Sequence, residues 1–283
     1  MTISGSAIVA GIAGRPVAHS LSPLLHNLWI EALNLDAAYV PFAPQLDDFE
    51  RFVRGLRGGA IRGFNVTAPF KERALALADV TDAAARDSGS ANLLLFHETG
   101  EIEARSTDGA GLLAAFAEQA PHLDLTAGPV VILGAGGAAR AAAAALVEAG
   151  APKIAILNRT AARAEELVFA LKADSLSAHG LSEAEALFRT AQVVVNAAAG
   201  GPAPPLDTLP EGAAVMDMTY RPLETGLLRA AKARGLTPVD GLAMLINQAK
   251  PSFEAFFGQA PPDLDVRSAA IAAMDAPRLQ ASA

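Results

Sequence analysis

The stretch Pro129-Val130-Val131-Ile132-Leu133-Gly134-Ala135-Gly136-Gly137-Ala138-Ala139 decides the fold class of this chain. Residues 130–133 are uniformly apolar, as expected of a short strand buried on both faces of a sheet. Gly134 permits the tight turn that follows, and Gly136 lets the backbone approach a pyrophosphate with no Cβ in the way. Gly137, Ala138 and Ala139 open a helix whose free N–H groups and positive dipole end face that anion. The stretch predicts a dinucleotide-binding turn; a glycine turn without a ligand is the alternative.

Strand-like and helix-like stretches alternate on both sides of this turn, which is typical of an α/β fold. In the first part we expect strands at 7–12, 37–42, 63–66 and 93–96, a hairpin-like return at 102–105, and helices at 23–33, 46–55 and 71–78. In the second part we expect strands at 130–133, 153–157, 192–196 and 213–217, and helices at 111–118, 138–149 and 161–172. The second series is a doubly wound, Rossmann-type pattern.

This alternation predicts two domains. We expect an N-terminal α/β substrate domain with a mostly parallel sheet at 1–106 and a Rossmann-type dinucleotide-binding domain at 107–240. The last long helix pattern, 242–257, should pack back on the first domain as part of a return segment at 241–275. Pro251 should kink or interrupt that helix, because proline lacks the N–H group and its ring clashes with the preceding turn.

Composition limits the classes of function. Of the 283 residues, 52% are hydrophobic and 18% are charged, which is a folded globular balance at a length that suits two domains. The net charge is -8 without any basic block, which excludes a nucleic-acid footprint. The absence of cysteine excludes disulfides, thiolate zinc sites and cysteine nucleophiles, and it suits a reducing cytosol.

No segment indicates a membrane anchor or a metal site. Residues 1–14 lack a basic start followed by a long apolar run, and the Ala-rich stretch 138–149 is too short to span a bilayer. The five histidines show no paired spacing with carboxylates, and we interpret His19 and His26 as structural hydrogen-bonding residues. We expect a cytoplasmic protein with a small-molecule substrate and no nucleic-acid or membrane partner; a homodimer stays open.

The end of the second strand of the dinucleotide-binding part indicates which nicotinamide cofactor is used. Asn158-Arg159-Thr160 stands where an NAD enzyme would place a carboxylate on the ribose hydroxyls. Arg159 can clamp a 2′-phosphate bidentately, Arg163 can add a second contact, and Thr160 can offer a hydroxyl. The residues therefore favour NADP over NAD. The alternative for Arg163 is a surface pair with Glu166 on the same helix.

Polar residues in the first part suggest a substrate site. In His19-Ser20-Leu21-Ser22-Pro23 the two serines alternate along an extended segment, so their hydroxyls point the same way. Two hydroxyls beside a helix start form an uncharged clamp for a carboxylate. The alternative is that Ser22 is only the cap of the helix that Pro23 begins.

A lysine and an aspartate are the candidate reacting pair. In Asn65-Val66-Thr67-Ala68-Pro69-Phe70-Lys71 the lysine falls in the first turn of a helix, where the positive dipole end repels a cation. A position that costs stability suggests a role in proton transfer. Asp108, at the junction of the two domains, can pair with Lys71, and active sites favour such clefts. The alternatives are a solvated surface lysine and an ordinary turn aspartate.

Six motifs in the same order resemble those of the shikimate dehydrogenase family over nearly the whole chain. They are Gly14-Arg15-Pro16-Val17-Ala18-His19-Ser20-Leu21-Ser22-Pro23-Leu24-Leu25-His26-Asn27, Asn65-Val66-Thr67-Ala68-Pro69-Phe70-Lys71, Ser106-Thr107-Asp108-Gly109-Ala110-Gly111, Asn158-Arg159-Thr160, Asp217-Met218-Thr219-Tyr220-Arg221-Pro222, and Gly241-Leu242-Ala243-Met244-Leu245-Ile246-Asn247-Gln248.

The resemblance implies a role for individual residues. Lys71 and Asp108 would be the catalytic pair, and Ser20 and Ser22 would bind the substrate carboxylate. Further substrate contacts would come from Thr67, Asn92, Tyr220 and Gln248. Cofactor contacts would come from Gly134, Gly136, Gly137, Ala138, Ala139, Asn158, Arg159, Thr160 and Arg163, with Gly241 and Met244 near the nicotinamide.

The resemblance also implies a reaction, the reversible NADPH-dependent reduction of 3-dehydroshikimate to shikimate in aromatic amino acid biosynthesis. The cofactor would supply the hydride and Lys71, alone or with Asp108, would handle the proton. One alternative is an NAD-dependent quinate/shikimate dehydrogenase, and a second is a non-catalytic NADP-binding sensor of the same fold. Rates with both cofactors and with both substrates would distinguish the three.

Overall fold

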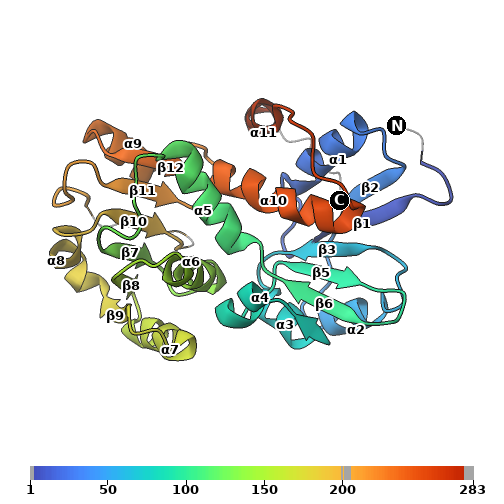
Figure 1. Cartoon of the computed structure of the whole chain (residues 1–283), viewed down its shortest axis with the longest axis horizontal. Coiled ribbons are helices and arrows are strands. Elements are labelled where there is room, and N and C mark those ends of the chain that lie inside the picture. The colour runs from blue at the N-terminus through green and yellow to red at the C-terminus, as the bar shows by residue number, and fades with distance from the viewer. Residues whose placement is uncertain (1–2, 199, 201–204, 277–283) are drawn as a thin grey trace.

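The computed structural model describes residues 3–198, 200 and 205–276, and it contains two six-stranded sheets. Figure 1 shows the sheets side by side, with the helices α5 (Asp108–Gln119) and α10 (Gly241–Phe257) running between them. The first sheet is built from residues 8–105 and the second from residues 130–240. This is the two-part α/β architecture that the sequence predicts.

The first sheet has the strand order β2-β1-β3-β5-β6-β4. Its strands are β1 (Ile8–Ala13), β2 (Ala37–Phe42), β3 (Gly63–Val66), β4 (Val80–Thr81), β5 (Leu93–Phe96) and β6 (Ile102–Arg105), and its helices are α1 (Ser22–Ala32), α2 (Phe49–Arg54), α3 (Lys71–Ala76) and α4 (Ala83–Ser88). β1 is parallel to β2 and β3, and β4 is parallel to β6, whereas β5 runs antiparallel to both of its neighbours. The mostly parallel sheet and the hairpin-like return are therefore confirmed.

The second sheet is parallel throughout, with the order β12-β11-β10-β7-β8-β9. Its strands are β7 (Val130–Leu133), β8 (Ile154–Asn158), β9 (Leu176–Gly180), β10 (Val193–Asn196), β11 (Ala214–Asp217) and β12 (Thr237–Asp240), and its helices are α6 (Gly137–Glu148), α7 (Ala161–Leu171), α8 (Ala184–Phe188) and α9 (Gly226–Ala233), with a 3-10 turn at Leu181–Glu183. The strand order reverses between β7 and β10. Open parallel sheets bind ligands at such a switch point, and the glycine turn follows β7 there.

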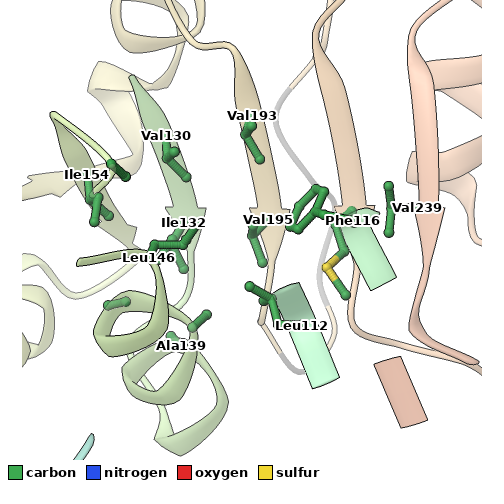
Figure 2. Close-up of a cluster of buried hydrophobic side chains, with 14 of the residues drawn as sticks. Leu112, Phe116, Val130, Ile132, Ala139, Leu146, Ile154, Val193, Val195 and Val239 are labelled. Carbon is green, nitrogen blue, oxygen red and sulfur yellow. The ribbon is translucent and has the colours of Figure 1, made fainter. Parts of the chain in front are cut away.

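A dry hydrophobic layer holds helices against one face of the second sheet. Figure 2 shows Val130 and Ile132 of β7 beside Val193 and Val195 of β10, with the α5 side chains Leu112 and Phe116 reaching the same layer. Several alanines of α6 are fully buried in this layer, so that helix lies close to the sheet. Each large apolar side chain buried in this way contributes about 1.5–3 kcal/mol. This layer fixes the glycine turn, because that turn joins β7 to α6.

Helix α10 belongs to both halves of the molecule. Ala243 and Met244 pack in the core of the second sheet, whereas Leu245 and the phenylalanines near its end pack in the core beside β1 and α1. The expected return to the first domain is therefore present. Pro251 was expected to kink or interrupt this helix. The interruption is wrong, because α10 continues as one helix to Phe257, whereas a kink stays a prediction. Burial of Ser252, Phe253 and the residues after them holds the final turns in place despite the missing N–H.

Several short elements escaped the sequence prediction. These are β4, α4, β9, α8, α9, β12 and the C-terminal helix α11 (Val266–Asp275), which packs against α1 and α10. By contrast, the predicted bounds of β2, β3, β5 and β6 agree with the structure. No helix within residues 3–198, 200 and 205–276 combines the length and apolarity that crossing a bilayer requires.

Candidate active site

One polar pocket collects all the residues expected to bind substrate or to react. It lies where the ends of β1 and β3 meet α1, α3, α5 and α10. The predicted residues that line it are Ser20, Ser22, Thr67, Lys71, Asn92, Asp108, Tyr220 and Gln248. They come from distant parts of the chain, so this convergence is a property of the fold.

Lys71 and Asp108 form an ion pair inside this pocket. The Lys71 ammonium lies 2.5 Å from Oδ2 of Asp108, and the two side chains are 20% and 4% exposed. Asp108 is the first residue of α5, where the helix dipole stabilises a carboxylate. Lys71 is the first residue of α3, where the dipole disfavours it, and the carboxylate offsets that cost. A solvated surface lysine and an ordinary turn aspartate are therefore both excluded.

Asn92 connects this pair to its surroundings. Its Nδ2 donates to Oδ1 of Asp108 at 3.0 Å, to the Thr107 hydroxyl at 2.9 Å and, more weakly, to Oε1 of Gln248 at 3.3 Å. Its Oδ1 accepts from the Thr107 N–H at 2.8 Å. Because a backbone N–H can only donate, this bond fixes the orientation of the amide. Asn92 thus holds the free oxygen of Asp108 in a set direction.

The two serines also line the pocket. The Ser20 hydroxyl accepts from the Ser22 N–H at 3.2 Å, and the Ser22 side chain is buried. Ser22 is not the helix cap, since Leu21 occupies that position and Ser22 already begins α1. The cap interpretation of Ser22 is therefore wrong. Tyr220 reaches the backbone of Leu21, and burial raises the pKa of its hydroxyl.

The glycine turn has the geometry of a pyrophosphate cradle. Gly134 has φ +109°, and a Cβ there would lie 3.0 Å from the backbone nitrogen of Ala198. Among the described residues, no atom outside the turn lies within 4 Å of a Cβ placed on Gly136 or Gly137, so these residues leave the space beside the N-terminus of α6 open. The residues present therefore fit a dinucleotide phosphate, which needs close approach to the backbone. In the first turn of α6, Ala139 is buried and Ala138 is partly exposed.

The predicted 2′-phosphate clamp lies at the end of β8. Arg159, Thr160 and Arg163 are exposed there, and the Asn158 amide donates to the carbonyl of Thr160 at 3.0 Å. In the described part of the chain neither arginine forms an ion pair, so the alternative Arg163–Glu166 pair is absent. Thr160 stands at the cap position of α7, but its hydroxyl does not bond to the helix.

Gly241 and Met244 lie at the end of α10 nearest the second sheet. A Cβ on Gly241 would lie 2.5 Å from the carbonyl oxygen of Met218, so the backbone contact there requires glycine. Met244 is buried, and Gln248 stands one helical turn further along. A single helix thus connects the expected nicotinamide side to the substrate pocket.

Two structural features were missed or misread in the sequence. His26 is fully buried, and neither ring nitrogen has a hydrogen-bond partner within residues 3–198, 200 and 205–276, so the structure does not support its interpretation as a hydrogen-bonding residue. Its ring instead stacks on Tyr39 at 4.0 Å, and burial lowers its pKa to about 3. The Tyr39 hydroxyl donates to Oδ1 of Asn65 at 2.7 Å, below the pocket. Among the described residues, no group of three or more His, Asp or Glu side chains could hold a metal ion.

The fold and the pocket together define a class. A doubly wound sheet with a glycine turn, together with a polar pocket that holds an ammonium–carboxylate pair, is the arrangement of a two-domain nicotinamide-dependent oxidoreductase. Family models match two parts of the chain: the shikimate dehydrogenase substrate binding domain at residues 12–94 and shikimate / quinate 5-dehydrogenase at residues 116–204. The chain belongs to the shikimate dehydrogenase family.

Individual relatives agree with this assignment. The chain is 55% identical to shikimate dehydrogenase (NADP(+)) of Caulobacter vibrioides over 95% of this chain and 96% of that protein. Among solved structures, shikimate 5-dehydrogenase of Thermus thermophilus in complex with NADP(H) and shikimate has TM-score 0.80 and 36% identity over 94% of this chain and 98% of that one. Quinate dehydrogenase of Corynebacterium glutamicum in complex with NAD has TM-score 0.83 and 27% identity over 95% and 97%.

Proposed function

We propose that this chain catalyses the reversible, NADPH-dependent reduction of 3-dehydroshikimate to shikimate in aromatic amino acid biosynthesis. The observation that carries the proposal is the Lys71–Asp108 ion pair, at 2.5 Å, in the polar pocket of a chain 55% identical to a shikimate dehydrogenase (NADP(+)). The reaction needs a proton donor beside the ring ketone and a pocket whose own charges do not repel the substrate carboxylate. The pocket fits both needs, since Lys71 supplies an ammonium and the charge of the Asp108 carboxylate is offset by that ammonium.

The proposed roles on the substrate side follow from where the side chains lie. The hydroxyls of Ser20 and Ser22 hold the substrate carboxylate, with Tyr220 at the same end of the pocket. Thr67 and Gln248 bind ring hydroxyls. Asn92 also binds a ring hydroxyl. Its Nδ2 gives up its longest contact, 3.3 Å to Oε1 of Gln248, and donates to the substrate instead. These contacts set the orientation of the ring. The serine hydroxyls donate to the carboxylate at one end, and the other polar side chains bind the ring hydroxyls.

The proposed proton path uses Lys71. Its ammonium donates a proton to the ketone oxygen during reduction, and its neutral amine takes the hydroxyl proton during oxidation. Asp108 holds the Lys71 nitrogen at 2.5 Å and stabilises its positive charge. Asn92 fixes the other carboxylate oxygen, so Asp108 stays directed at the lysine. Positioning by these two residues keeps the proton within reach of the reacting oxygen.

The proposed cofactor side is formed by the second sheet. When bound, NADPH supplies the hydride. The backbone at Gly134, Gly136 and Gly137 and the first turn of α6, with Ala138 and Ala139, bind the pyrophosphate. Arg159 and Arg163, with Asn158 and Thr160, bind the 2′-phosphate, and Gly241 and Met244 lie beside the nicotinamide. We assign residues 1–106 and 241–275 to the substrate domain and 107–240 to the NADP domain, in a cytoplasmic protein.

The test is a spectrophotometric assay that follows reduced nicotinamide. We expect the reduction of NADP by shikimate to be fastest. Replacing shikimate by quinate, or NADP by NAD, should give slower rates. Faster turnover with NAD and quinate would favour the quinate dehydrogenase alternative. Binding of NADP without turnover of either substrate would indicate a non-catalytic sensor and would refute the proposed function.

A further inference from the structure

A hydroxyl on α10 lies at the centre of a buried hydrogen-bond network beneath the pocket. Ser252 is fully buried and stands one helical turn after Gln248. Its Oγ lies 2.9 Å from Nδ2 of Asn65 at the end of β3, and 3.4 Å from the Thr107 hydroxyl just before α5. It also lies 3.2 Å from the backbone carbonyl of Gln248. One side chain thus joins three elements that build the pocket.

The direction of each bond at Ser252 follows from its partners. The Asn65 Nδ2 also donates to the backbone carbonyl of Asn92 at 3.1 Å, which can only accept, so the amide must donate toward Ser252 as well. The Gln248 carbonyl likewise takes the single proton of Ser252. The remaining lone pair of Ser252 is then free to accept from the Thr107 hydroxyl. The donor and both acceptor sites of Ser252 are all used.

The network continues from Ser252 to the reacting pair. The Thr107 hydroxyl accepts from Nδ2 of Asn92 at 2.9 Å, and the same nitrogen donates to Oδ1 of Asp108 at 3.0 Å. Asp108 in turn holds the Lys71 ammonium. In a buried site the orientation of each polar group depends on the groups that it bonds. A chain of hydrogen bonds therefore runs from the Ser252 hydroxyl through Thr107, Asn92 and Asp108 to the Lys71 nitrogen, which is the proposed proton donor.

We propose that Ser252 is a positioning residue for the reaction. By accepting from Thr107 and Asn65 it holds the Asn92 amide, and Asn92 then sets the angle at which Asp108 presents its carboxylate to Lys71. An alanine at position 252 leaves the Thr107 hydroxyl without this acceptor, so Asn92 and Asp108 lose part of their fixed orientation. The inference rests on the proposed function, because its effect is measured on shikimate turnover.

The primary test is Ser252→Ala, which removes only the hydroxyl at a helical position that favours alanine. We expect kcat for shikimate oxidation to fall about tenfold, the usual worth of one buried hydrogen bond, with KM for NADP unchanged. The matched control is Ser88→Ala, because Ser88 is another buried, hydrogen-bonded serine, but it lies on α4 outside the polar pocket. A merely structural role for Ser252 would lower Tm in both variants and leave kcat unchanged.

A double-mutant cycle tests the path itself. Thr107→Val removes the hydroxyl that links Ser252 to Asn92, so adding Ser252→Ala to it should lower kcat by much less than tenfold. Fully additive losses would show that Ser252 does not act through Thr107. Should Ser252→Ala fail to fold, wild-type kcat in Thr107→Val would equally overturn the proposal. A wild-type protein that does not oxidise shikimate would refute the proposed function instead, so the two failures are distinct.

Discussion

The substrate pocket and the cofactor face of this molecule are built in opposite ways. In the pocket, Asp108 and Asn92 are buried and Lys71 is partly buried, and Asp108 is bonded to both of the others. On the cofactor face, the turn at Gly136 is open, and Arg159 and Arg163 are exposed. We infer from this difference that the side chains of the substrate pocket hold one another in place, whereas the proposed cofactor face would gain its contacts from the phosphates of NADP.

The largest effect is expected from a substitution in the substrate pocket. Lys71→Ala removes the proposed proton donor, so turnover should fall by about 10² to 10⁴, the usual range for acid–base catalysis. NADP affinity should change little, because Lys71 lies in the substrate pocket. Steady-state kinetics and a NADP titration would measure both quantities. The control is Lys250→Ala, an exposed lysine of the same α10 that borders the pocket; wild-type turnover in Lys71→Ala would remove that residue from the mechanism.

The next largest effect is expected from a substitution on the proposed cofactor face, which should leave the substrate pocket unchanged. Arg159→Ala removes a proposed charge-assisted contact to the 2′-phosphate, so KM for NADP should rise about 10- to 100-fold. The kinetics with NAD should be unchanged, because NAD lacks that phosphate. Parallel assays with the two cofactors would show the split. An equal loss with both would place Arg159 in the structure of the fold and not in cofactor selection.

A pair of glycine substitutions sharpens the comparison within the turn. Gly134→Ala should destabilise the protein by about 1–3 kcal/mol, because φ of +109° is strained for any residue with a Cβ. A Cβ at Gly136 meets no described atom outside the turn within 4 Å, and the backbone there is extended, so Gly136→Ala should leave Tm nearly unchanged. It should nevertheless weaken NADP binding, because its methyl group occupies the space of the pyrophosphate. Thermal unfolding with and without NADP measures both; equal Tm losses in the two variants would contradict this interpretation.

The last and smallest effect is the change in stability per pH unit that comes from the buried His26. Burial lowers the pKa of His26 from 6.5 to about 3, so the folded protein keeps His26 neutral. The unfolded chain takes up a proton below pH 6.5, and stability therefore falls as pH drops from 6.5 toward 3. The slope from this residue is at most about 1.4 kcal/mol per pH unit. His26→Phe, which keeps a stacked ring on Tyr39, should flatten urea midpoints across that window; an unchanged slope would rule out this contribution.

The sequence predicted the fold and the members of the site better than the way they interact. Some features can be recognised from a few consecutive residues, such as the glycine turn after a buried strand and the alternate serines before Pro23. The bond from Asn65 to Ser252 joins positions 187 residues apart, and no local pattern marks it. The stacking of His26 on Tyr39 was equally invisible, because it depends on how α1 crosses β2. The short strand β4 was missed for a related reason, since its two residues are defined as a strand only by pairing with Glu103 and Ala104 of β6.

Hydrogen exchange of the backbone amides tests the contrast between the two sites most directly. Without ligand, the amides at 63–66, 91–96 and 107–116 should already exchange slowly, and saturating NADP should leave them nearly unchanged. The amides at 134–140 and 159–163 should become markedly slower when NADP is added. Fast exchange around Asp108 that slows only with NADP, together with a cofactor turn that is protected beforehand, would contradict the account.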